Sequence, residues 1–260
     1  MIVQSQSAIP ARELPPPRLD IRRCALFLDL DGTLIELAAR PQDVMVDAEL
    51  LELLRDLYRA TGGALAMITG RTLADLDSLL DPLHLPAAGQ HGIECRQADG
   101  HVFVVAASAA ARDSVRVEVA ECVRQHVGLQ LEDKGFAFAV HYRNAPLVPV
   151  EPLREQLAAI AAQTGGEYEL LEGAKVIELK PVGSNKGLAI EYFLSLSPFC
   201  GRRPIFLGDD VTDLCALETV TRAGGVAVAA GPRVRAEWQL PGPATVRAWL
   251  QSLLPEWIEA

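Results

Sequence analysis

The sequence has no paired-cysteine motif, no surplus of basic residues and no long apolar run. Its five cysteines are scattered and odd in number, which argues against a disulfide framework or a zinc site and favours a reducing cytoplasm. Acidic residues outnumber basic ones, so that the formal net charge is -10, and no basic patch is evident. Such a surface would repel a polyanion, and we therefore expect no nucleic-acid partner.

The longest nearly apolar run, over residues 102–111, is about half of the roughly 20 residues that a membrane helix needs. The N-terminus carries no basic-then-apolar signal pattern. We therefore expect a soluble, unexported protein without a membrane partner. Residues 1–20 contain four prolines and no apolar periodicity, which predicts a disordered tail.

Two parts of the chain alternate short apolar strands with helical stretches. With half of its 260 residues hydrophobic, the chain can bury one large core or two smaller ones. Asp47 is a predicted helix N-cap, and another helix is predicted to open at Ser184. Alternation of strand and helix predicts a Rossmann-like parallel α/β core. The predicted strands cover residues 24–31, 64–70, 204–210 and 224–231, and the predicted helices 47–61, 72–81, 184–196 and 211–220.

The pattern changes between these two parts. Residues 113–128 and 150–165 are helical, residues 129–143 alternate with period two, and residues 168–181 resemble a hairpin. Alternating strands are half exposed, as in an antiparallel sheet with helices on one side. We therefore predict an α/β core over residues 21–104 and 182–260, interrupted by a smaller α+β cap domain over residues 105–181.

Polar residues gather where the predicted core strands end, which is where open α/β sheets bind ligands. Carboxylates that crowd together repel one another unless a cation lies among them, and hard oxygen ligands favour Mg²⁺. Asp29, Asp209 and a main-chain carbonyl near Asp31 would suffice to bind it. The gathered residues are Asp29, Asp31, Thr69, Lys186, Asp209, Asp210 and Asp213.

The spacing of Asp29 and Asp31 favours phosphoryl chemistry. A carboxylate is ionised at neutral pH and can attack phosphorus without a base, so Asp29 can be both a metal ligand and a nucleophile. Asp31, two residues on, can protonate the leaving alkoxide and then accept a proton from water. Taken alone, each of the four polar segments that carry these residues could be a turn, a helix cap or a solvated charge. Four such segments in order favour a catalytic site.

Four segments, "DLDGTL", "ITGR", "KG" after "KPxG", and "GDDVTD", resemble in order the motifs of the haloacid dehalogenase-like phosphatases. Within that superfamily, "LEDKGFAFAVHYRNAP" followed by "ELKPVGSNKG" resembles the trehalose-6-phosphate phosphatases, and the resemblance covers residues 22 to 250. It implies that Asp29 forms an aspartyl-phosphate and that Asp31 is the acid/base. It also implies a mobile α/β cap inserted between the second and third motifs.

The resemblance implies further roles. Thr69 and Lys186 hold the transferring phosphoryl oxygens, Asp209 joins the Mg²⁺ ligands, and Asp210 and Asp213 orient the lysine and metal-bound waters. In the cap, the residues implied to bind glucose hydroxyls are Glu132, Lys134 and Glu178. The family pattern "GDDxTDE" ends here with Leu214 in place of glutamate, which puts the positioning of the acidic helix in question.

The resulting prediction is a Mg²⁺-dependent monomeric phosphatase that hydrolyses trehalose 6-phosphate and is coupled in function to a trehalose-phosphate synthase. Alternatives are a phosphatase for mannosylglycerate or sucrose phosphates, a mutase that returns the phosphoryl group to sugar, and a non-catalytic phosphosugar sensor, for which Leu214 is the one hint. Three other residues, His91, His141 and Arg143, either face the cleft expected between core and cap or have a structural role. They are not part of the predicted catalytic set.

Overall fold

The larger of two sheets has eight strands, and its centre is parallel. The computed structural model describes residues 16–38, 44–173 and 175–254. The strand order is β12-β11-β10-β1-β2-β3-β4-β5, in which β4 alone runs antiparallel to the other strands. The bounds are β1 Cys24–Leu28, β2 Leu65–Ile68, β3 Ala87–Gly89, β4 Glu94–Arg96, β5 Val102–Val104, β10 Arg203–Gly208, β11 Val226–Ala230 and β12 Trp238–Leu240.

Helices cover both faces of this sheet, because its central strands are apolar on both sides. In β1, Leu26 and Leu28 pack into a cluster with α1, α2 and α7, whereas Phe27 packs into a second cluster with α5 and α6. All three side chains are fully buried, as expected for a parallel strand between two helical layers. The helices are α1 Ala48–Ala60, α2 Leu73–Leu80, α5 Lys186–Leu194, α6 Leu214–Arg222 and α7 Pro243–Ser252.

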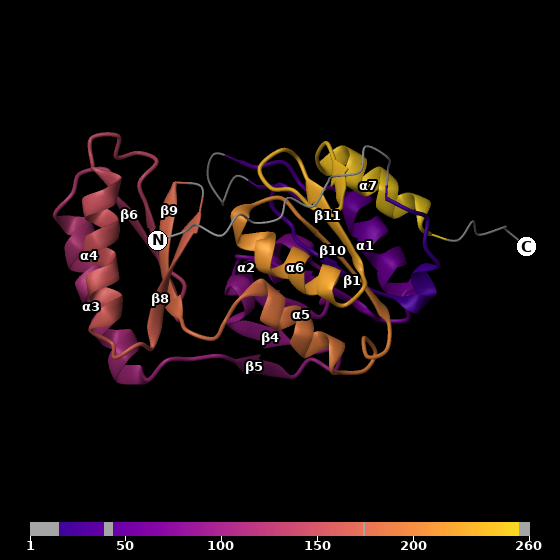
Figure 1. Ribbon diagram of the computed structural model, residues 1–260, viewed down its shortest axis with the longest axis horizontal. Helices are drawn as coiled ribbons and strands as arrows, with labels where there is room; N and C mark the ends of the chain where they lie inside the picture. Colours follow the sequence, from indigo (N-terminus) through magenta and orange to yellow (C-terminus); the bar gives the residue numbers. More distant parts are fainter. Residues whose placement is uncertain (1–15, 39–43, 174, 255–260) are drawn as a thin grey trace, which may run out of the picture.

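The smaller sheet is antiparallel and has four strands in the order β6-β7-β9-β8. Phe138, Val140 and Ile177 point from it into a core shared with α3 and α4, which lie on its side away from the larger sheet (Figure 1). The bounds are β6 Gln130–Asp133, β7 Phe138–His141, β8 Tyr168–Gly173, β9 Val176–Pro181, α3 Ala109–Arg124 and α4 Val150–Ala162. The predicted fold class, an α/β core with an α+β cap, is confirmed, and the boundaries at residues 105 and 181 stay a prediction.

Glu167 ties together the two chain segments that pass between the sheets. Its carboxylate accepts hydrogen bonds from the Ser108 main-chain N–H, at 2.6 Å, and from the Ser108 hydroxyl, at 2.9 Å. Its carbonyl accepts the N–H of Val182 at 2.9 Å. One residue therefore contacts the segment that leaves the larger sheet and the segment that returns to it.

Two local predictions were wrong. The N-cap of α5 is Asn185, whose side chain accepts the Leu188 N–H, and not Ser184, whose hydroxyl donates to the Pro181 carbonyl. The alternating stretch 129–143 is not one strand but two, because Gly135, with φ of +84°, allows a turn there. Lys134 therefore lies just beyond β6 and not on the same strand as Glu132.

The last residues of the predicted disordered tail, 16–20, pack against the folded core. The carbonyl of Pro16 accepts a hydrogen bond from the indole of Trp249 at 3.1 Å, and Leu19 packs against the core. The first 15 residues of the predicted tail lie outside the described residues. Among the described helices, none has the length and apolarity to span a membrane.

Candidate active site

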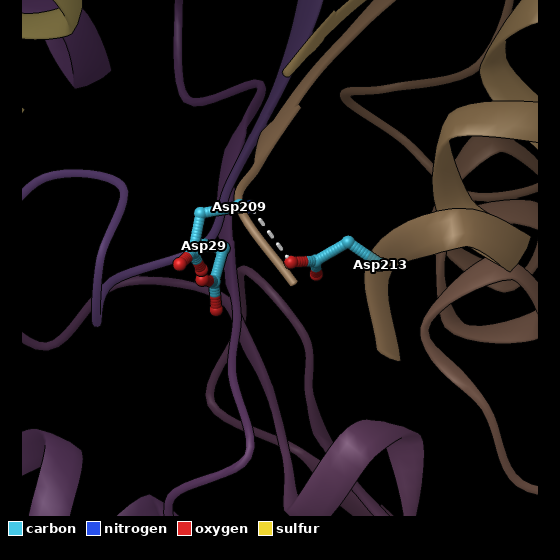
Figure 2. A group of neighbouring side chains, drawn as sticks. All are labelled: Asp29, Asp209 and Asp213. Atoms are coloured by element: carbon cyan, nitrogen blue, oxygen red, sulfur yellow. Dashed lines mark hydrogen bonds between the residues drawn. The ribbon is translucent and has the colours of Figure 1, made fainter. Parts of the chain in front are cut away.

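Two aspartates meet because neighbouring parallel strands end at the same edge of the sheet. Leu28 of β1 is in register with Leu207 of β10, so Asp29 and Asp209 follow their strands side by side. The Asp29 N–H donates to the Leu207 carbonyl at 3.0 Å, which fixes the start of this segment. Figure 2 shows both carboxylates beside Asp213, which is held at the start of α6.

Lys186 joins two of these carboxylates. Its ammonium donates to Asp29 Oδ1 at 2.8 Å and to Asp213 Oδ1 at 2.6 Å, and its side chain is only 3% exposed. The other oxygen of Asp213 accepts the main-chain N–H groups of Asp209, at 2.9 Å, and Asp210, at 3.0 Å (Figure 2). Asp213 therefore orients the lysine and the 209–210 loop, which is the arrangement expected for a positioning residue.

Burial dominates the electrostatics of this group. Desolvation, opposed by Lys186 and reinforced by Asp213 and Asp209, raises the pKa of Asp29 well above its ordinary range. Burial likewise raises the pKa of Asp209 to about 7, although the Arg233 guanidinium lowers it. Burial would lower the pKa of Lys186, but Asp213 and Asp29 raise it above its usual value. The carboxylates therefore lack part of the positive charge that would stabilise their ionised forms.

The donor atoms fit a hard divalent cation. Carboxylate oxygens of Asp29, Asp209 and Asp213 lie within 4.8 Å of one another. Asp213 accepts three hydrogen bonds, two of them from main-chain N–H groups, whereas Asp29 accepts only the side-chain donors Lys186 and Thr33, which makes Asp29 and Asp209 the better side-chain ligands. Gly32, with φ of +80°, makes room for Asp209, because a Cβ there would lie 2.1 Å from Asp209 Oδ2. Mg²⁺ is typically bound by one or two carboxylates together with water and substrate oxygens.

Asp31 points toward an arginine outside the set of site residues predicted from the sequence. Arg71 donates from Nε to Asp31 Oδ2 at 2.7 Å and from Nη2 to Asp31 Oδ1 at 2.6 Å, a bidentate pair that fixes the carboxylate. Any contribution of Asp31 to the predicted metal site would thus come from its main-chain carbonyl. Thr69 is buried beside this pair, and its hydroxyl accepts the Arg71 N–H at 3.1 Å.

The cap contributes the opposite wall of the cleft. Glu132 and Glu178 lie in one row across the sheet, each in register with Ala139. The Lys134 ammonium donates to Glu178 Oε2 at 2.9 Å and to the carbonyl of Gly70, in the core, at 3.1 Å. Burial opposes the charge of Lys134, but Glu178 and Glu132 raise its pKa above the usual value. Lys134 is therefore a charged link between the cap and the core.

A strained turn places a histidine at the same cleft. Gln90 and His91 both have positive φ angles, 47° and 57°, which are uncommon for side chains with a Cβ. The His91 imidazole lies over Gly70, where a Cβ would approach it to 2.7 Å, and its Nε2 is 3.9 Å from Glu178 Oε2. Burial and the nearby Lys186 and Lys134 hold the pKa of His91 well below its usual value, so this side chain is neutral.

These side chains line one cleft of about 560 Å³ between the larger sheet and the cap. Thr69 is adjacent to the cleft and does not line it, and the lining among the described residues does not include Leu214. Arg71 and Arg233 were missed as site residues, although Arg71 ends the "ITGR" segment; no sequence signal marks Arg233. Nine predicted residues do line the cleft: Asp29, Asp31, Glu132, Lys134, Glu178, Lys186, Asp209, Asp210 and Asp213. His91, His141 and Arg143 line it as well.

Comparison with known proteins identifies the family. The profile of the trehalose-phosphatase family matches residues 27–232. The trehalose-6-phosphate phosphatase of Escherichia coli K12 is 40% identical over 230 residues, which cover 88% of this chain and 86% of that protein. A "probable trehalose-phosphate phosphatase" of Sinorhizobium fredii is 39% identical over 236 residues, or 91% of this chain and 88% of that protein.

Solved structures agree with this assignment. The crystal structure of a "trehalose-6-phosphate phosphatase related protein" superposes with a TM-score of 0.72 at 26% identity, covering 87% of this chain and 95% of that one. The resemblance to the haloacid dehalogenase-like phosphatases that the four motifs indicate is confirmed, and the protein is a phosphatase. The chain belongs to the trehalose-phosphatase family.

Proposed function

We propose that this protein hydrolyses trehalose 6-phosphate to trehalose and phosphate in a Mg²⁺-dependent reaction through a phosphoaspartate at Asp29. The observation that carries the proposal is the composition of the cleft, with Asp29, Lys186 and Asp209 on the core side and Glu132, Lys134 and Glu178 on the cap side. Its volume of about 560 Å³ lies in the range of small-molecule sites. The names of the relatives support the same substrate.

Each proposed step uses a group with the required chemistry. A carboxylate oxygen of Asp29 attacks phosphorus, the bond from phosphorus to the sugar oxygen breaks, and Asp31 protonates the leaving alkoxide. Asp31 then accepts a proton from water, whose oxygen attacks the phosphoaspartate and releases phosphate. Arg71 holds Asp31 in one orientation throughout.

Lys186 and a cation supply the positive charge of the site. The Lys186 ammonium lies within hydrogen-bonding distance of Asp29 and would stabilise charge on the transferring phosphoryl oxygens. The same role for the Thr69 hydroxyl stays a prediction, because Thr69 does not line the cleft. Asp29, Asp209 and the main-chain carbonyl of Asp31 would hold Mg²⁺. When bound, Mg²⁺ polarises the phosphoryl group and reduces its repulsion from the carboxylates.

Release of phosphate from a panel of phosphosugars tests the proposal. Trehalose 6-phosphate should be hydrolysed far faster than glucose 6-phosphate, because its second glucose adds contacts with the cap that stabilise the competent state. Faster turnover of mannosylglycerate or sucrose phosphates would reassign the substrate, and phosphate transfer to a second sugar would indicate a mutase. No turnover of any phosphosugar would indicate a sensor.

Metal dependence is a separate expected result. Activity should be lost in excess chelator and return when Mg²⁺ is added, since Asp29 and Asp209 need a divalent cation between them. Asp209→Ala should abolish activity or raise the Mg²⁺ concentration for half-maximal rate by at least roughly tenfold. Full activity of the dialysed enzyme in chelator would contradict this assignment.

The cap residues Glu132, Lys134 and Glu178 are expected to bind the sugar and determine substrate specificity. Glu178 Oε1 is buried and has no hydrogen-bond partner among the described residues, so it is available to a substrate hydroxyl. Glu132→Ala or Lys134→Ala should lower kcat/KM for trehalose 6-phosphate at least tenfold, or about 1.4 kcal/mol, and leave hydrolysis of p-nitrophenyl phosphate nearly unchanged. Glu172→Ala, at an exposed carboxylate elsewhere in the cap, is the matched control. Equal losses on both substrates would mean that these residues support the fold.

Three expectations from the sequence stay predictions. They are a cytoplasmic location, a monomeric state and functional coupling to a trehalose-phosphate synthase.

A further inference from the structure

Arg233 is a second cation, after Lys186, beside the acidic cluster of Asp29, Asp209, Asp210 and Asp213. It lies on the loop between β11 and β12, and its Nη2 is hydrogen-bonded to Asp209 Oδ2. Its Nη1 lies 3.6 Å from Asp210 Oδ1. The two cations of the cluster are thus divided between its carboxylates, since Lys186 contacts Asp29 and Asp213 whereas Arg233 contacts Asp209 and Asp210.

The two cations differ in their freedom to move. The Lys186 side chain is 3% exposed and is held by two buried carboxylates, so it stays in the site. The Arg233 side chain is 34% exposed and lies on a loop at the mouth of the cleft, where its guanidinium can turn into water. Asp209 is 5% exposed, so the arginine is the solvent-accessible member of this ion pair.

We propose that Arg233 is a positioning residue that competes with the divalent cation for Asp209 and thereby sets the affinity of the site for Mg²⁺. The inference rests on the proposed metal site. A guanidinium N–H and a metal ion use the same carboxylate lone pairs, and a positive charge this close also repels the cation. Metal binding therefore displaces Arg233 from Asp209, at a cost in affinity.

Mg²⁺ titration calorimetry on the full chain tests the proposal. Arg233→Ala should bind Mg²⁺ more tightly by roughly tenfold, equivalent to about 1.4 kcal/mol. Arg233→Gln, which keeps a polar though shorter side chain without the charge, should also bind more tightly and guards against a folding defect. Arg235→Ala is the matched control, because Arg235 is an exposed arginine on the same loop and is not part of the cleft lining. It should change the affinity less than about twofold.

Thermal unfolding gives a second readout. Without Mg²⁺, Arg233→Ala should melt at a lower temperature than wild type, because Asp209 loses its ion-pair partner. Saturating Mg²⁺ should then raise its melting temperature by more than it raises that of wild type. Both shifts should be absent in Arg235→Ala.

The outcomes separate this inference from the proposed function. Equal or weaker Mg²⁺ binding by Arg233→Ala, with normal binding by wild type, would overturn the competition and leave the metal site intact. Unchanged Mg²⁺ binding with weaker binding of inorganic phosphate would make Arg233 a phosphate ligand instead. Failure of wild type and all variants to bind Mg²⁺ would overturn the metal assignment and this inference together.

Discussion

Asp29→Asn should reduce phosphate release from trehalose 6-phosphate by at least about 10⁴-fold, because an amide oxygen is a poor nucleophile and forms no phosphoenzyme. The fold should be kept, since Asp29 is a buried carboxylate with a raised pKa and an amide removes its desolvation cost. Steady-state phosphate release and acid-quench trapping of phosphoenzyme measure the result. A melting temperature close to that of wild type would show that the loss is chemical.

Asp31→Asn is the informative comparison for Asp29→Asn. It removes the acid/base but leaves the nucleophile, so one enzyme equivalent of phosphate should still be transferred to protein and then be released slowly. Wild-type activity of Asp29→Asn would eliminate the proposed mechanism. A burst of phosphoenzyme in Asp29→Asn would assign the nucleophile to another residue.

Lys186→Met should cost about 3–5 kcal/mol of unfolding free energy, because it leaves Asp29 and Asp213 buried without their shared cation. Turnover should fall at least about 100-fold, since the variant also lacks the charge beside the transferring phosphoryl group. Urea unfolding and phosphate release measure the two effects. Lys175→Met is the matched control, because Lys175 is an exposed lysine of the cap whose ammonium lies 5.7 Å from the Tyr142 ring.

The stability loss in Lys186→Met should depend on pH. Burial already raises the pKa of Asp29 well above its ordinary range, and removal of Lys186 takes away the interaction that lowers it most. The folded variant then binds a proton more tightly than the unfolded chain, so its stability deficit should shrink as pH falls from about 8 to about 5. A deficit below about 1 kcal/mol at neutral pH, or one as small as that of Lys175→Met, would contradict the role of Lys186 as the central cation.

Much of the fold could be read from local patterns. The spacing of Leu50, Leu54 and Leu57 after a capping aspartate predicts α1, and the structure has Asp47 as its N-cap. Three short strands, β3, β4 and β5, and the terminal β12 and α7 were not predicted. Strands of three residues carry too little periodicity to be recognised, and they form because the edge of an existing sheet offers hydrogen-bond partners.

The sequence by itself determined which acidic and basic residues meet at the edge of the larger sheet. Asp29 and Asp209 directly follow apolar strands, and parallel strands deliver their carboxyl ends to one edge whatever the loops do. Lys186 follows from the same rule, because its helix starts at that edge. Their convergence needed only the alternation of strands and helices.

Only the tertiary structure decided how those charges are paired. Arg71 meets Asp31 across 40 residues of sequence, and Arg233 meets Asp209 across 24. Both contacts depend on where a loop side chain points, and no periodicity reports that direction. The site chemistry is thus encoded in local pattern, whereas the orientation of Asp31 and the competition for Asp209 arise from loop conformations that the packed sheets impose.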